Sequence, residues 1–286
     1  MKKTNSKSLW AHAWDSLKSE KMAMISMIII AVYFMVAFLS FSGVIADGWT
    51  NEIGPSYAAP SSKYIFGLDI FGRSVFDKML KGTEIAVSVG LITCLISSII
   101  GVTLGAIAGY FGGKIDEFLI WFYTVFTSIP YILLLVAFAW VLGKGMLTVY
   151  VSLALTGWTG LFRLIRGEFI RHKDREYVHA ATAIGASHQK KIFKHILPNT
   201  LHIVIINFSL QFQTAIKSEV ILSYLGLGVQ GNPSWGVMIN DSKLELARGY
   251  WWQLAAATVA MMIIVLAFNI LSDALRDALD PKLKGK

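Results

Sequence analysis

The sequence has few charged residues and almost no cysteine. Charged side chains make up 15% of its 286 residues and hydrophobic side chains 55%, with a mean hydropathy of +0.58. Soluble domains carry about 25% charged residues, so the composition alone predicts an integral membrane protein. Cys94 is the single cysteine, which excludes an intramolecular disulfide, and the sequence holds no Cys/His cluster of the zinc-binding kind.

Several catalytic motifs are also missing. Neither Gly113-Lys114 nor Gly143-Lys144 is followed by Ser or Thr, so the sequence has no P-loop and we expect no ATP hydrolysis by this chain. It also lacks a Gly-x-Ser-x-Gly elbow and a His-Glu-x-x-His zinc site. His188, His195 and His202 keep a seven-residue spacing, but no carboxylate or thiol joins them. We therefore predict no catalytic residue, no metal site and no cofactor held by this chain.

Six windows without charged residues are long enough to cross a bilayer. Each reaches the ~17–25 residues that a spanning helix needs, and none alternates apolar and polar residues as the strands of a membrane barrel do. The predicted fold class is therefore an all-α integral membrane protein with six transmembrane helices. The windows are Met22–Ala46, Ile85–Gly113, Phe118–Gly143, Gly145–Phe162, Ile196–Ile216 and Gly249–Ser272.

The distribution of basic residues predicts the orientation. With six spans, both termini lie on the same side as segments 114–117 and 163–195. That side holds 18 Lys and Arg against 10 acids and the other side holds 8 against 8, so the whole net charge of +8 lies on one face. The positive-inside rule makes that face, and both termini, cytoplasmic. The first span is long and has no clear cleavage site, so we expect an uncleaved anchor.

Two stripes of residues mark individual spans. In the second span Ser97, Gly101, Gly105 and Gly109 recur every four residues. Small residues on one face let helices approach closely, so we favour helix packing over a glycine-lined pore wall. Before the first span, Leu9, Trp10, Ala13, Trp14 and Leu17 share a face among lysines, which is typical of a helix at the membrane interface or of a plain amphipathic lead-in.

The fifth span carries a single polar stripe. Its members are Asn207, Gln211, Thr214 and Ser218, at i, i+4, i+7 and i+11. Polar groups facing lipid are costly, so the stripe either lines a water-filled pore or bonds to other helices, and both readings stay open. We expect Lys217 and Glu219 to reach water beyond it. Segment 220–248 contains helix-breaking glycines and is predicted to be a partly apolar external loop over the outer mouth.

A strongly basic segment, 163–198, joins the fourth and fifth spans. We predict a short helix over Glu176–Ile184, ended by Gly185, and a second helix capped by Ser187 and closed by Pro198. Adjacent Ala180 and Ala181 would give the first helix a shallow surface that a partner can approach. On the second helix the predicted shared apolar face consists of Ile192, Phe193, Ile196 and Leu197. The particular spacing favours a docking element over a loop that only sets orientation.

The same segment carries a resemblance to a known family. His179-Ala180-Ala181, Gly185 and His195-Ile196-Leu197-Pro198 resemble the EAA loop of permease subunits in ATP-binding-cassette importers. Other motifs resemble the dipeptide/oligopeptide/nickel branch and, within it, the second or C-type permease, over about residues 65 to 281. These motifs are Phe66–Arg73, Ala108–Gly113, Arg175–Val178, His195–Asn199, Leu222–Gly228, Pro233–Gly236 and Leu275–Pro281.

The resemblance implies a type I ABC importer permease with a MetI-like core. Residues 1–82 would form the N-terminal segment, first anchor and external segment, residues 83–273 the transmembrane domain, and residues 274–286 a cytoplasmic tail. The chain would sit in the bacterial inner membrane as a multi-pass protein, in contact with lipid and with no nucleic acid. Its implied partners are a homologous second permease, two cytoplasmic ATPases that use ATP and Mg, and an external substrate-binding protein.

The resemblance also implies the role of the basic segment. The EAA-like loop, 163–198, would be the coupling helix that seats on an ATPase. The residues implied to dock there are Glu176, His179, Ala180, Ala181, Ile184 and Gly185. His179 stands where the family carries a glutamate, and Glu176, one turn earlier, could supply that charge.

The function expected from these features is that of a permease for di- and oligopeptides delivered by a binding protein. Three alternatives stay open: a self-sufficient channel or ion-coupled carrier, a membrane scaffold without transport, and the same importer role with nickel or another small solute. The spans hold no Asp, Glu, Lys or Arg in their interiors, which disfavours an ion-coupled carrier.

Overall fold

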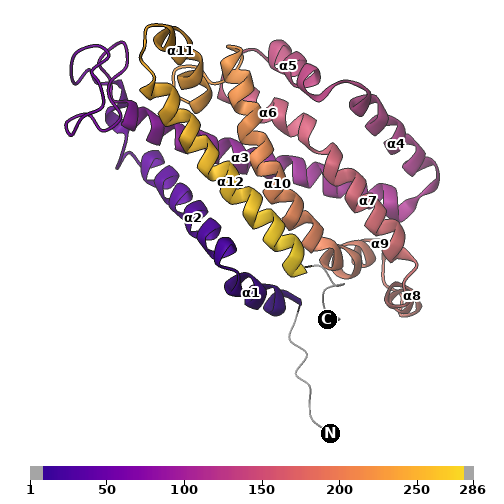
Figure 1. Cartoon of the computed structure of the whole chain (residues 1–286). Coiled ribbons are helices and arrows are strands. Elements are labelled where there is room, and N and C mark those ends of the chain that lie inside the picture. The colour runs from indigo at the N-terminus through magenta and orange to yellow at the C-terminus, as the bar shows by residue number, and fades with distance from the viewer. Residues whose placement is uncertain (1–8, 280–286) are drawn as a thin grey trace. The chain divides into compact units, whose positions relative to one another are not determined.

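The computed structural model describes residues 9–279, and the predictions for residues 1–8 and for the end of the tail lie outside this part. The described chain consists of helices joined by loops, with two isolated β-bridges, Glu52 to Arg73 and Leu68 to Ser74 (Figure 1). It forms two compact units. One runs to Val87 and resumes at Pro233, and the other is Ser88–Asn232. The predicted boundaries after residues 82 and 273 separate functional parts of the chain, do not coincide with the boundaries of these compact units, and stay a prediction.

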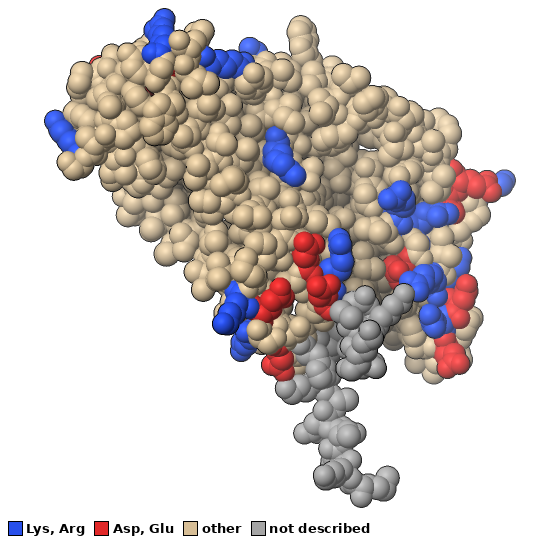
Figure 2. Space-filling model, in the orientation of Figure 1, with Lys and Arg blue, Asp and Glu red and all other residues tan. Residues whose placement is uncertain are grey.

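The first unit is built around two long apolar helices. In it, α2 (Lys21–Phe41) and α12 (Trp252–Leu279) run side by side, and the Tyr33 hydroxyl on α2 donates to the Ala260 carbonyl on α12 at 2.8 Å (Figure 1). Figure 2 shows an uncharged surface over α2. The other elements of this unit are α1 (Leu9–Ser19), the short helix η1 (Asp47–Thr50), the start of α3 (Val75–Phe111) and α11 (Trp235–Ala247).

The apolar face of α1 covers protein. Ala13 and Leu17 are buried, and Leu17 packs in a cluster with Ala23 and Ala274. Trp14 stays half exposed, with the Lys18 ammonium 5.0 Å from its ring centroid. The described residues fit both readings of this segment, so the choice between an interfacial helix and an amphipathic lead-in stays open.

The second unit contains the rest of α3 and the elements that follow it. These are α4 (Gly113–Ser128), α5 (Tyr131–Leu142), α6 (Met146–Gly157), α7 (Thr159–Lys173), α8 (Glu176–Ala183), α9 (His188–Lys190), the π-helical η2 (Lys191–Ile196) and α10 (Leu197–Tyr224).

The glycine stripe of α3 packs against the backbone of the next helices. A Cβ atom added at Gly105 would lie 2.7 Å from the Phe162 carbonyl oxygen, and one at Gly109 would lie 2.6 Å from the Arg166 carbonyl oxygen. Gly101 makes the same kind of approach to α6–α7. Any side chain here would push the helices apart, so the prediction of close helix packing is confirmed.

The described helices account for four spans, or five if a bent pair counts as one. The four are Lys21–Phe41, Val75–Phe111, Met146–Lys173 and Trp252–Leu279, and the pair is α4 with α5. The remaining predicted span corresponds to α10. Its 28 residues give a length of ~42 Å at 1.5 Å per residue, but its polar side chains lower its hydropathy below that of the other spans.

The third predicted span is not one straight helix, which corrects the sequence prediction. α4 ends at Ser128, α5 begins at Tyr131, and the two meet at 90°. Pro130 lies at the bend, and Ile129 before it is extended, with φ −92° and ψ 131°. Proline lacks the N–H that would continue the helix and disfavours helical geometry in the preceding residue. A count of uncharged residues cannot detect such a break.

Segment 220–248 is more helical than predicted. α10 continues to Tyr224, and after a glycine-containing turn Ser234 begins α11, accepting a hydrogen bond from the Val237 N–H at 3.2 Å. Trp235 is fully buried and its indole N–H donates to the Met79 carbonyl at 3.1 Å. This part of the chain is therefore a packed element rather than an open loop.

Candidate functional site

The basic segment begins as a helix. α7 carries it as far as Lys173, so Arg163 and Arg166 lie within a helix rather than in a loop. The Arg166 guanidinium binds the Asp116 carboxylate of α4 through two hydrogen bonds of 2.6 Å each. After a short turn, α8 runs over Glu176–Ala183, which confirms the predicted short helix to within one residue.

The turn after α8 is the one that the sequence predicts. Gly185 has φ +78°, its N–H donates to the Thr182 carbonyl at 3.0 Å, and the Ala186 N–H donates to the Ala181 carbonyl at 2.9 Å. This pair of bonds is a Schellman motif, which needs a residue in the left-handed region and therefore favours glycine. The Ser187 hydroxyl then accepts from the Lys190 N–H, which confirms the predicted cap.

One face of α8 is buried and the other is open. Glu176, His179, Ala180 and Gly185 are exposed, and Ile184 is 84% exposed. Ala181 is only 4% exposed, so it is not on the open face, which corrects the predicted docking set. Val178 and Ala181 are three residues apart on the same helical face, and Val178 packs with Phe169, Ile192 and Ile196. We call the open residues Glu176, His179, Ala180, Ile184 and Gly185 the α8 surface.

Three side-chain contacts fix the segments on either side of this surface. The Lys191 ammonium donates to the Thr182 hydroxyl at 3.3 Å, the Tyr110 hydroxyl lies 2.8 Å from His188 Nδ1, and the Tyr177 hydroxyl lies 2.8 Å from His172 Nδ1. Burial raises the pKa of the Tyr177 hydroxyl above its ordinary value. The α8 surface is therefore held firmly on the second unit.

The helix after Ser187 differs from the prediction in two ways. Phe193 is 64% exposed, whereas Ile192 and Ile196 are buried, so the four predicted apolar residues do not share a face. Pro198 does not end the helix, because the π-helical turn η2 leads directly into α10 and places Pro198 in the first turn of that helix. Proline has no N–H to donate, and it directly follows the π turn, where the Leu197 N–H bonds to the Ile192 carbonyl and the regular i to i−4 pattern is already interrupted.

The polar stripe of α10 borders a cavity of about 230 Å³ within the second unit. Asn207, Gln211 and Thr214 line it, together with residues from four other helices. Among the lining residues of the described chain none is charged. Those that contribute hydroxyl groups are Thr93, Tyr131, Thr156, Thr159 and Thr214. We call this the polar cavity. Three of the four predicted stripe residues therefore share one polar surface, and pore lining stays a prediction.

Gln211 joins three helices at the wall of the polar cavity. Its Nε2 donates to the Gly157 carbonyl of α6 at 3.1 Å and to the Ser97 hydroxyl of α3. Its Oε1 and the Thr93 hydroxyl are buried and have no hydrogen-bond partner within the described structure. Buried polar atoms are normally paired, so these two can accept a water or a polar solute group that enters.

Ser218 has a different role from the rest of the stripe, which corrects its assignment. It is buried, its hydroxyl lies 3.0 Å from the Tyr131 hydroxyl, and it is outside the lining of the polar cavity. Glu219 is also buried and accepts a hydrogen bond from the Ser223 hydroxyl at 2.6 Å, so it does not reach water as predicted. Tyr131 both lines the polar cavity and contacts the Ser218 hydroxyl. The sequence analysis did not identify it, because a window of uncharged residues does not reveal that the span bends at Pro130 and that Tyr131 begins a new helix there.

A buried charged network in the first unit was also missed. The Lys78 ammonium lies 3.0 Å from Asp69 Oδ2 and donates to Gln253 Oε1 at 2.8 Å, while Gln253 Nε2 donates to Glu245 Oε2 at 3.1 Å. Burial raises the pKa of Glu245 to about 7, an effect that the Lys78 charge partly opposes. The described residues contain no group of three or more His, Cys, Asp or Glu that could hold a metal ion.

Comparisons with known proteins all match this chain to permease components of transport systems. A family described as the binding-protein-dependent transport system inner membrane component matches residues 101–285, and one described as the N-terminal TM domain of oligopeptide transport permease C matches residues 8–56. The dipeptide transport system permease protein DppC of Bacillus subtilis (strain 168) is 39% identical over 95% of this chain and 85% of its own length.

Two further relatives extend the comparison. The oligopeptide transport system permease protein OppC of Bacillus subtilis (strain 168) is 35% identical over 97% of this chain and 91% of its own. The glutathione transport system permease protein GsiD of Pectobacterium atrosepticum is 37% identical over 79% of this chain and 75% of its own.

A solved structure shares the fold. It is the MetNI methionine ABC transporter, described as inward facing, and the match has a TM-score of 0.58 at 17% identity over 71% of this chain and 96% of the matched chain. The predicted MetI-like fold is confirmed.

Proposed function

The chain belongs to the family of binding-protein-dependent transport system inner membrane components, and we infer that it is the permease subunit of an ATP-driven importer of peptides. It is a multi-pass protein of the inner membrane. The observation that carries the mechanism is the α8 surface, an open helical turn held rigidly on the second unit. Relatives named for dipeptide and oligopeptide transport support the substrate class.

The α8 surface has the properties of a docking site for another protein. Ile184 exposes 84% of its surface, and the small Ala180 and Gly185 beside it allow close approach. Burying a side chain of this size contributes about 1.5–3 kcal/mol. We propose that a cytoplasmic ATPase covers this surface, with Glu176 supplying the acidic contact that His179 cannot provide. Figure 2 shows acidic and basic side chains lying together around α8, which suits a polar rim.

The proposed partners follow from the family. A second, homologous permease would complete the pathway, two ATPases would use ATP and Mg, and a binding protein would deliver the substrate on the outer side. This chain would not hydrolyse ATP. Both termini would lie in the cytoplasm, on the same side as the α8 surface.

The polar cavity is the proposed share of this chain in the pathway. Its lining offers uncharged donors and acceptors, with Gln211 Oε1 and the Thr93 hydroxyl unpaired. Such groups match the amide N–H and C=O groups of a peptide and do not select a particular charged side chain. Glutathione is itself a short peptide, so the relative named for its transport fits the same class of substrate.

The alternatives are less well supported. An ion-coupled carrier needs ionisable groups along its pathway, and the polar cavity is lined by uncharged residues of the described chain. A scaffold without transport leaves a polar cavity inside apolar helices unexplained. Nickel prefers imidazole and carboxylate ligands, which the cavity lining does not offer.

The test compares Ile184→Ser with Leu244→Ser. Leu244 lies on α11 and is 73% exposed, so it is a matched change on a different surface. We expect Ile184→Ser to weaken association with the ATPases about tenfold or more, since the loss of ~1.4 kcal/mol is a factor of ten. Peptide uptake into vesicles should fall with it, whereas Leu244→Ser should leave both unchanged. Normal co-purification with the ATPases and normal peptide uptake by Ile184→Ser would refute the docking role. A separate measurement checks the substrate class: unlabelled dipeptides should compete with the labelled peptide for uptake, and Ni²⁺ should not.

A further inference from the structure

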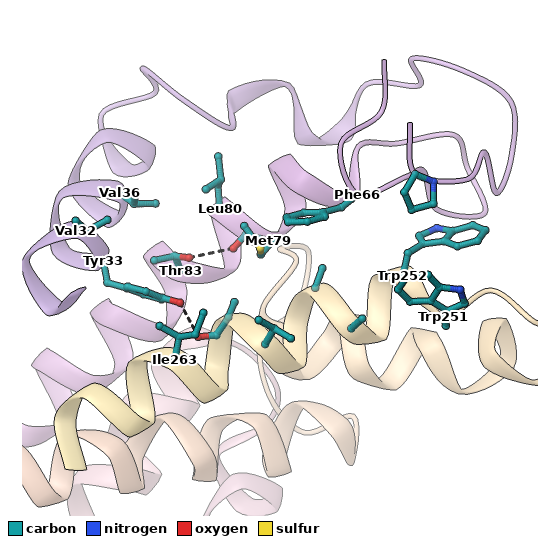
Figure 3. Close-up of a pocket in the computed structure, with 15 residues that line it drawn as sticks. Val32, Tyr33, Val36, Phe66, Met79, Leu80, Thr83, Trp251, Trp252 and Ile263 are labelled. Atoms are coloured by element: carbon teal, nitrogen blue, oxygen red, sulfur yellow. Dashed lines mark hydrogen bonds between the residues drawn. The ribbon is translucent and has the colours of Figure 1, made fainter. Parts of the chain in front are cut away.

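The first unit contains a second cavity of about 440 Å³, lined almost entirely by hydrocarbon. Its walls come from α2, the start of α3, the segment before α3, and α12, as Figure 3 shows. Val32 and Val36 face Ile263 across it, and Phe66 and Trp252 lie at the end toward the loops (Figure 3). The volume lies within the roughly 300–1,000 Å³ of small-molecule sites. We call it the apolar cavity.

Polar groups in the wall of this cavity bond to the protein itself. The Tyr33 hydroxyl donates to the Ala260 carbonyl at 2.8 Å, the Thr83 hydroxyl to the Met79 carbonyl at 3.1 Å, and the Trp252 indole N–H to the Leu68 carbonyl at 2.9 Å. The donor hydrogens of these three groups are therefore already used within the protein. Apolar cavities of this kind do not hold ordered water, so the occupant must itself be hydrocarbon.

The apolar cavity opens onto the membrane-facing surface of two spans. Val32 on α2 is 45% exposed and Val259 on α12 is 48% exposed, and both line the cavity. The exposed apolar surface continues along the same helices through Met35 and Met262, which lie outside it. Because α2 and α12 are long and apolar enough to span a bilayer, lipid chains can reach this exposed apolar surface. The cavity is thus a recess in a surface whose composition suits contact with lipid.

The rim toward the loops suits a lipid headgroup. Trp251 lines the cavity there and is 57% exposed, and it directly precedes α12. Tryptophan is enriched at the level of the headgroups, where its ring packs on hydrocarbon and its N–H can donate to an ester or phosphate oxygen. Recess and rim together match one molecule with a long apolar chain and a polar end.

We propose that the apolar cavity is a binding site for one acyl chain of a membrane phospholipid, with its headgroup at Trp251. A helix of a partner protein fits less well. A helix about 10 Å across fills roughly 80 Å³ per Å of its length, so 440 Å³ would hold about one turn. A flexible chain can fill the recess completely, and close packing of this kind is the normal state of a protein interior. The proposal does not depend on which solute is transported.

The experiment uses the assembled transporter in nanodiscs of phosphatidylethanolamine and phosphatidylglycerol. A tracer phosphatidylethanolamine carries a photoreactive diazirine midway along one acyl chain, and labelled peptides are identified by mass spectrometry. The filled variant is Ala255→Phe with Val259→Phe, since both residues line the cavity without being fully buried. The matched control is Thr258→Phe with Met262→Phe, which adds the same rings to exposed positions of the same helix that do not line it.

In the wild type and the control we expect labelling to concentrate on the α2 and α12 peptides that line the cavity. In the filled variant it should fall about tenfold there, because the rings occupy the volume of the chain. Equal labelling of the filled variant and the control would overturn the proposal. A photoreactive residue at position 259 that crosslinks to a partner protein instead of lipid would also overturn it. If the double variant is not recovered, Val259→Phe against Met262→Phe gives the same comparison.

Discussion

The protonation of Glu245 gives the sharpest test of the buried network in the first unit. Glu245 is only 4% exposed, and its carboxylate accepts a hydrogen bond from the uncharged amide of Gln253 at 3.1 Å. Burial raises its pKa from 4.5 to about 7, with the carboxylates of Asp69 and Asp241 adding to the rise and Lys78 opposing it. We predict that Glu245→Gln stabilises the protein at alkaline pH.

The magnitude and sign follow from the shift. At ~1.36 kcal/mol per pKa unit, a rise from 4.5 to about 7 corresponds to about 3 kcal/mol. The folded state holds this proton more tightly than the unfolded state does. The contribution of Glu245 is therefore fully present below pH 4.5 and is lost as the pH rises through about 7. At pH 8.5 the glutamine variant should be more stable by up to about 3 kcal/mol, and near pH 5 the difference should be small.

The assay is the free energy of unfolding of the purified full chain in detergent, measured by tryptophan fluorescence between pH 5 and 8.5. The control is Glu52→Gln, an exposed glutamate of the same unit. Burial also raises the pKa of Asp241, so the Glu245→Gln variant should keep part of the pH dependence. If Glu245→Gln and Glu52→Gln give the same pH profile as the wild type, the burial argument is wrong.

Two further predictions concern the second unit. Gly105→Leu should lower the free energy of unfolding by about 1–3 kcal/mol or more, because its Cβ would meet a carbonyl oxygen at 2.7 Å. The control is Gly160→Leu, which has open space around its Cβ and should lower the free energy of unfolding by less than half as much in the same assay. Equal losses would contradict the close packing of α3. Gln211→Leu should change the KM for peptide uptake without changing association with the ATPases, because it removes an unpaired acceptor from the polar cavity, and unchanged uptake kinetics would remove Gln211 from the pathway.

Local signals explain why the basic segment was predicted well. The ends of α8 depend on Gly185 and Ser187, whose backbone and capping preferences act within a few residues. Which face of α8 is open depends on α7 and η2 instead. Ala180 and Ala181 are equivalent in sequence, and only the packing of Val178 against Phe169 decides that Ala181 is the buried one.

The spans show the limits of hydropathy. Apolar windows located the long helices, but the uncharged window 118–143 concealed the bend at Pro130 because a proline changes direction without changing hydropathy. The polar stripe of α10 also lowers its hydropathy, so that α10 is the least apolar of the predicted spans. The network of Lys78 with Gln253 was out of reach for a different reason: its members are 175 positions apart and meet only after folding.

The π-helical turn η2 sets the angle between the α8 surface and the polar stripe of α10. From His188 to Tyr224 the chain is one uninterrupted helical run, and the Leu197 N–H reaches back five residues to the Ile192 carbonyl. Each residue of an α-helix turns the chain by about 100°, so the single extra residue of a π turn offsets everything before it relative to everything after it. Deleting that residue would leave the length of the helical run almost unchanged, but it would rotate the α8 surface about the axis of α10 relative to Gln211. The number of residues in the π turn therefore sets this rotation, whichever side chains the turn carries.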